Sequence, residues 1–109
     1  MVMTDSTLVA ATSTSANVLA GKMNEFLSEN SVIRIYVTGG GSDVFASLLV
    51  GAEALIDDQL VSPLTTFPVK PDDLLTEGAG FAGDRLTLRY RNGNAAARTV
   101  QTRIEVEPL

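Results

Sequence analysis

The chain of 109 residues lacks cysteine, histidine and tryptophan, and these absences exclude several kinds of functional site. Without cysteine there is no disulfide, no thiolate ligand for zinc and no nucleophilic thiol. Without histidine there is no imidazole to act as a general base or to bind a metal. Catalysis would have to depend on carboxylates alone, so we expect no enzyme activity, no cofactor and no metal site.

Long hydrophobic runs are also missing. No window approaches the roughly 18 consecutive apolar residues of a membrane-spanning helix. Residues 1–11 contain no basic residue followed by an apolar stretch, the pattern of a signal peptide. Hydrophobic residues still make up 45% of the chain, which is enough for a core. We therefore expect one soluble domain without a membrane span.

Positive charge is scarce and unevenly distributed. The net charge of −5 argues against tight nucleic-acid binding, because phosphate contacts depend on Lys and Arg, and nucleic acid is not an expected partner. Residues 1–83 hold ten acidic and three basic residues, a net charge of −7. Residues 84–109 hold five arginines and three acidic residues, a net charge of +2. Such asymmetry is satisfied either within one molecule or between neighbouring molecules.

The clearest strand covers residues 31–38. Ile33, Ile35 and Val37 alternate with residues that point the other way, and β-branched side chains are frequent. The strand is expected to end at the three glycines of residues 39–41, since neither a strand nor a helix accommodates them without cost.

The C-terminal quarter predicts a hairpin. Leu86 and Leu88 share one face of its first strand, and Val100 and Ile104 share one face of its second. A three-residue turn at 92–94 places Leu86 opposite Val100, which keeps apolar residues on one face. The residues expected in the core are Ile35, Leu86, Leu88 and Ile104.

Other segments are ambiguous. Residues 43–62 fit an amphipathic helix and two strands around a turn at 51–52 equally well. Residues 15–27 likewise suit a helix or a strand. Residues 64–69 suggest a short extended piece between prolines, and the Gly- and Ala-rich residues 72–83 suggest a loop.

The N-terminal segment is polar. Between residues 4 and 15, Leu8 and Val9 are the only bulky apolar residues, a composition typical of an extended arm or an edge strand. We expect an arm at residues 1–15 and a domain at residues 16–109. The arm is expected to be poorly ordered in an isolated subunit and to become ordered against a neighbour.

Two pairs of acidic residues are the strongest candidates for chemistry. A glycosidase or an oxygen-ligated metal site would need such pairs. However, adjacent residues of a strand point to opposite faces, and the D-x-D-x-D-G spacing of a calcium loop is absent. Arginines of residues 85–91 lack the interleaved aromatic residues that stack on nucleic-acid bases. We interpret these charges as solvated or subunit-contacting. The acidic pairs are Asp57-Asp58 and Asp72-Asp73. The candidate subunit-interface residues are Leu8, Val9, Asp72, Asp73, Arg85, Arg89 and Arg91.

Three stretches together resemble small virion proteins of bacteriophages, especially marine ones. The likeness covers most of residues 17–106, whereas the polar residues 1–15 depart from it. The three stretches are NVLAGKMNEFL at 17–27, FPVKPDD at 67–73 and AGDRLTLRYRN at 82–92.

The resemblance implies an all-β fold, a single antiparallel β-sandwich that is jelly-roll-like, and it favours strands for residues 43–62. It also implies a structural protein of the virion that forms or decorates a bacteriophage capsid. Its partners would be copies of itself and other capsid proteins. The alternative function is a non-catalytic β-sandwich module that binds a carbohydrate or a receptor. Such modules usually present exposed aromatic platforms, and this chain has only Tyr36 and Tyr90 besides four phenylalanines.

Overall fold

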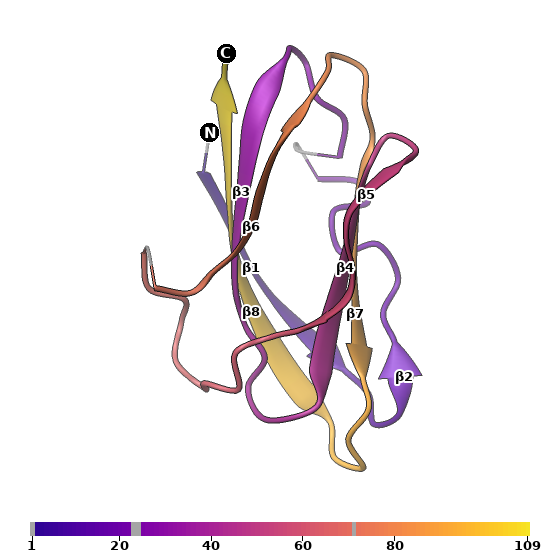
Figure 1. Cartoon of the computed structure of the whole chain (residues 1–109). Helices are drawn as coiled ribbons and strands as arrows, with labels where there is room; N and C mark the ends of the chain where they lie inside the picture. Colours follow the sequence, from indigo (N-terminus) through magenta and orange to yellow (C-terminus); the bar gives the residue numbers. More distant parts are fainter. Residues whose placement is uncertain (1, 23–24, 71) are drawn as a thin grey trace.

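The structure is a computed structural model that describes residues 2–22, 25–70 and 72–109. It is all-β, with two four-stranded antiparallel sheets (Figure 1). The strand order is β1-β8-β3-β6 in the first sheet and β2-β7-β4-β5 in the second. Within these residue ranges no helix has the length and hydropathy needed to cross a bilayer. The strands are β1 (Val2–Val9), β2 (Ser13–Thr14), β3 (Ser31–Thr38), β4 (Val44–Val50), β5 (Glu53–Leu60), β6 (Leu74–Gly80), β7 (Leu86–Asn92) and β8 (Arg98–Pro108).

Buried apolar side chains from both sheets form one core cluster. The predicted core residues Ile35, Leu86, Leu88 and Ile104 are all 0% exposed, which confirms their assignment. Burying each such side chain stabilises the fold by roughly 1.5–3 kcal/mol. The predicted strand at residues 31–38 is also confirmed, because it is β3.

The ambiguous residues 43–62 contain β4 and β5, joined by a turn at Gly51. The two strands pair with each other, so the two-strand alternative is confirmed. Gly51 has a φ of +61°, a conformation that glycine adopts without steric cost. Residues 15–22 and 25–27 are neither helix nor regular strand. Residues 23 and 24 of that ambiguous segment lie outside the described residues.

The predicted hairpin between β7 and β8 is wrong. The two strands belong to different sheets, and residues 93–97 connect one sheet to the other. The apolar faces of β7 and β8 still meet, but across the core: the Tyr90 hydroxyl hydrogen-bonds the Thr102 hydroxyl. Burial raises the pKa of Tyr90. Side-by-side and face-to-face strands carry the same alternating pattern, so the sequence pattern did not separate them.

The predicted loop at residues 72–83 is wrong for its central part, which forms β6. Glycine weakens a strand, but here two glycines make room for side chains. A Cβ at Gly78 would lie 2.5 Å from a Leu55 methyl carbon, and one at Gly80 would lie 2.5 Å from a Leu27 methyl carbon. The glycines therefore let the strand pass close to the core. Residues 64–69, which the sequence predicts as a short extended piece, contain no regular element.

The N-terminal segment contains an edge strand of the first sheet. β1 pairs with β8 from Val2↔Glu105 to Val9↔Arg98 without a break in register. Val9 is only 2% exposed and belongs to the core, whereas Leu8 is 70% exposed on the opposite face of the strand. The edge strand is one of the two alternatives that the composition of residues 4–15 indicated, and such a strand needs few apolar side chains. The behaviour of residues 1–15 in an assembly stays a prediction.

Candidate functional site

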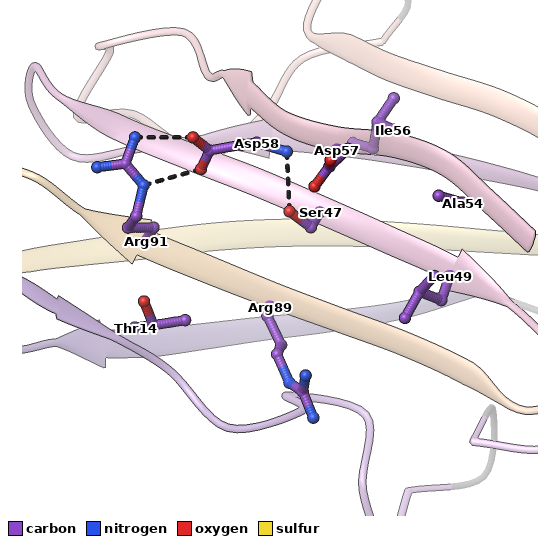
Figure 2. Close-up of a pocket in the computed structure, with 9 residues that line it drawn as sticks. All are labelled: Thr14, Ser47, Leu49, Ala54, Ile56, Asp57, Asp58, Arg89 and Arg91. Carbon is purple, nitrogen blue, oxygen red and sulfur yellow. Dashed lines mark hydrogen bonds and ion pairs between the residues drawn. The ribbon is translucent and has the colours of Figure 1, made fainter. Parts of the chain in front are cut away.

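A hollow of about 550 Å³ lies on the outer face of the second sheet, away from the core (Figure 2). All four strands of that sheet contribute to it. Its floor is partly apolar and its rim carries charged groups of both signs. The residues that line the hollow are Thr14, Ser47, Leu49, Ala54, Ile56, Asp57, Asp58, Arg89 and Arg91.

The acidic part of the hollow is built on a bulge in β5. Ala46 pairs with Gln59 and Leu48 pairs with Ile56. Between these pairs, the two residues Asp57 and Asp58 of β5 lie opposite the single residue Ser47 of β4. Asp58 has a φ of +52°, which costs free energy for a residue other than glycine. Its backbone N–H donates to Ser47 Oγ at 2.8 Å, which partly offsets that cost. Bulges bend a strand and redirect its side chains.

Arg91 and Asp58 form a two-pronged ion pair at one end of the hollow. Arg91 Nε and a terminal guanidinium nitrogen donate to the two Asp58 carboxylate oxygens at 2.8 and 2.9 Å. The Arg91 guanidinium also lies 4.2 Å from the centre of the Phe45 ring. The hydrogen bond from Arg91 lowers the pKa of Asp58. Both side chains are thereby fixed, and their charges are mutually neutralised.

Arg89 and Asp57 differ from this pair. Both residues are exposed, and neither side chain forms an ion pair or hydrogen bond with any residue that the structure describes. Figure 2 shows Arg89 pointing away from the Arg91–Asp58 pair. The hollow thus offers one unpaired cation and one unpaired anion, which suits contacts with the charges of another molecule.

The structure disperses the other candidate interface residues. Arg85 pairs with Glu25 at 2.9 Å near the start of β7. Asp73 closes the turn before β6, where its carboxylate accepts from the Val69 N–H at 2.8 Å, and Asp72 is exposed beside it. Leu8 and Val9 lie on β1 in the first sheet. Among the seven candidates, therefore, only Arg89 and Arg91 line the hollow.

A second charged cluster lies on the outer face of the first sheet, and its acidic and basic side chains pair with one another. Glu105, whose side chain is 11% exposed, lies 2.8 Å from Lys70 and 3.0 Å from Arg103. The hydrogen bond from Lys70 is the largest influence lowering the pKa of Glu105. Lys70 belongs to the β5–β6 connection, and it also lies 5.9 Å from the centre of the Tyr36 ring. This cluster holds the connection on the sheet.

Sequence reasoning found the charged residues of the hollow but missed how they are arranged. The paired acids and the arginines were visible in the sequence. The bulge that turns Asp58 towards Arg91 had no sequence signal, since it depends on how β5 pairs with β4. The charge asymmetry is partly satisfied within the molecule, because Arg85 and Arg91 both pair with acids from the first 83 residues.

No cluster of three or more acidic side chains in the described ranges is arranged to hold a metal ion. Comparison of the chain with protein-family models, curated proteins and solved structures finds no match.

Proposed function

We propose that this protein is a structural component of a virus particle, a jelly-roll β-sandwich that assembles through contacts between copies to form or decorate a bacteriophage capsid. The observation that carries the proposal is the strand order. Odd and even strands alternate between sheets along most of the chain, and only β4 and β5 are consecutive in one sheet. The resulting orders, 1-8-3-6 and 2-7-4-5, support an eight-stranded jelly roll, an architecture common in capsid proteins.

The surface supports an interaction role. Five large apolar side chains are exposed within residues 60–74, where the β5–β6 connection leaves the second sheet, and Phe26 and Phe81 are exposed as well. Exposed apolar residues gathered on one segment favour protein contacts. The five residues of that segment are Leu60, Leu64, Phe67, Val69 and Leu74.

The outer face of the second sheet supplies the polar part of such a contact. The unpaired Arg89 and Asp57 would find opposite charges on a neighbouring copy, whereas the fixed Arg91–Asp58 pair keeps the surface rigid. Ser47 Oγ accepts from Asp58, and the hollow contains no imidazole or thiol that could activate a nucleophile. These features favour a binding face over a reaction centre.

The test is the mass of the purified full chain by sedimentation velocity over a wide concentration range, with negative-stain electron microscopy of the heaviest fraction. We expect closed particles or oligomers of defined size, weakened by salt. Arg89→Glu should weaken them, whereas Thr99→Glu, on the outer face of the other sheet, should have less effect. A chain that stays monomeric, fails to bind capsids and binds a glycan would contradict the proposal and favour the binding-module alternative.

A further inference from the structure

The four edge strands of the two sheets differ in how well they could accept a further strand. β2 has two residues, and the pairing of β5 with β4 shifts register twice. The pairing of β6 with β3 shifts once, near its start. β1 alone combines length with regularity, since its eight residues pair with β8 in one register. A long regular edge presents N–H and C=O groups in the spacing that another strand needs.

The free side of β1 is open in the described part of the chain. Among the residues that the structure describes, no backbone group of β1 bonds to backbone outside the strand ladder. Two of its backbone groups contact side chains: the Val9 carbonyl accepts from Asn92 at 3.2 Å, and the Ser6 N–H donates to the Asp5 carboxylate. Unpaired backbone groups at an edge are solvated, so a second strand would mainly replace water.

An inward charge normally protects an edge strand from pairing, and β1 has one in Asp5. Here the charge is compensated within the subunit. Lys22 lies 2.5 Å from the Asp5 carboxylate, the Thr7 hydroxyl donates to it, and the Asp5 side chain is 13% exposed. Asp5 therefore does not forbid pairing, but it restricts the register, because two such carboxylates opposite each other would repel.

The side chains of β1 alternate between the two faces of the sheet, and this limits the registers in which two copies of β1 can pair. Val2, Thr4, Ser6 and Leu8 face outward, and the residues between them face the core side. In an antiparallel pair, opposed residues share a face, so a two-fold axis must pass through one residue of β1. With the axis at Asp5, the two Asp5 carboxylates lie opposite each other. With the axis at Thr7, Asp5 lies opposite the apolar Val9 of the partner. An axis at Ser6 avoids both conflicts.

We propose that two copies of this chain pair antiparallel through β1, with Ser6 opposite the partner's Ser6, so that two first sheets become one continuous eight-stranded sheet. In this register Asp5 faces the partner's Thr7 and Met3 faces the partner's Val9, so polar meets polar and apolar meets apolar. The exposed Leu8 lies opposite the partner's Thr4. This inference rests on the proposed function, since it names the first contact through which copies assemble.

Because the chain has no cysteine, single introduced thiols can report this register. Opposed residues of antiparallel strands have Cα atoms roughly 4.5–5.5 Å apart, within the range that a disulfide bridges. Ser6→Cys should therefore form a disulfide dimer under mild oxidation. Thr4→Cys alone should not, because its two copies would be offset by four residues, about 14 Å. An equal mixture of Thr4→Cys and Leu8→Cys chains should form the mixed dimer.

A charge variant tests the same axis without oxidation. Ser6→Lys opposes two ammonium groups and should raise the dimer dissociation constant about fivefold or more in sedimentation. Thr99→Lys is the matched control on the neighbouring strand β8, where the dissociation constant should change little. Equal effects of the two variants would overturn the proposal, because they would indicate an effect of the added lysine that does not depend on its position opposite the partner's β1.

The outcomes separate this inference from the proposed function. Particles that form without cross-linking at Ser6→Cys, or that cross-link equally at Thr4→Cys alone, overturn the β1 pairing and leave the proposed function standing. Dimers that cross-link at Ser6→Cys but never assemble further support the pairing and contradict the capsid function. A chain that is monomeric at every concentration overturns the pairing.

Discussion

The two edges of the first sheet are closed by different means. At β6, Gly78 and Gly80 bring the backbone close to the core, where Leu55 and Leu27 fill the space over them. At β1, the core side is completed by the Asp5–Lys22 ion pair, and the outer side carries short polar residues. One edge therefore depends on steric fit and the other on charge. Substitutions at the two edges should consequently differ in size and in pH dependence.

Among changes at either edge, removal of β1 should reduce the unfolding free energy most. Deletion of residues 2–9 removes the buried Val9 and uncovers the edge of β8, which otherwise lies between two strands. The loss of unfolding free energy in urea should exceed the roughly 1.5–3 kcal/mol contributed by burial of Val9 alone. An unchanged unfolding midpoint would mean that this segment is an arm, as its composition first indicated.

Gly80→Val should have the next largest effect, because its side chain would collide with Leu27, Val50 and Ile33. Overpacking of this kind costs about 1–3 kcal/mol, measurable by thermal or urea unfolding. Ala79→Val is the matched control, since Ala79 is exposed on the other face of β6, and its effect should stay within about 0.5 kcal/mol. Equal stability of the two variants would refute steric closure of this edge.

Asp5→Asn should give a smaller effect that depends on pH. Burial raises the pKa of Asp5, but hydrogen bonds from Lys22 and Thr7 and the Lys22 charge lower it by more, so the folded pKa lies below the ordinary value of 3.8. The carboxylate therefore stabilises the fold fully above that value and loses its contribution as pH falls through the folded pKa. At neutral pH the variant should lose about 1 kcal/mol of unfolding free energy, and the difference should vanish in acid.

A double-mutant cycle with Lys22→Met separates this ion pair from other acid effects. In the Lys22→Met background, Asp5→Asn should have a much smaller effect at neutral pH, because the partner charge is gone. Undiminished destabilisation in that background would mean that Asp5 acts through Thr7 or through packing.

Leu8→Ser should have the smallest effect on the isolated subunit. Leu8 is exposed on the outer face of β1, so the unfolding free energy should change by less than about 0.5 kcal/mol. Self-association through β1 should weaken more clearly, which sedimentation would detect. A large loss of subunit stability would show that Leu8 packs within its own subunit.

The sequence predicted those parts of the fold that rest on alternation of buried side chains. β3 and the core residues on β3, β7 and β8 followed directly from period-two patterns. β6 did not, because Gly78 and Gly80 read locally as loop residues, and their role depends on Leu55 and Leu27, which are distant in the chain. The assignment of β7 and β8 to different sheets also depends on long-range contacts that leave no local signal.

The candidate site was predictable in residue type and not in geometry. Arg89 and Arg91 are two residues apart in a strand and therefore share its outer face, so their position away from the core followed from the alternating pattern. The neutralisation of Arg91 by Asp58 did not, because it requires a bulge that places a residue with positive φ beside β4. Which of two neighbouring arginines stays free was therefore decided by backbone irregularity in another strand.

The central position of β8 has a consequence for how the molecule folds. β8 is synthesised after the other seven strands, yet it lies between β1 and β3 and bonds to both. Until β8 emerges from the ribosome, β1 and β3 are not joined in one sheet. Both strands then expose the edges that pair with β8 in the finished fold. Val2 must then meet Glu105 across nearly the whole chain. Such distant pairing makes folding slow, in the range of milliseconds to seconds, and gives newly made chains time to meet each other before each is complete.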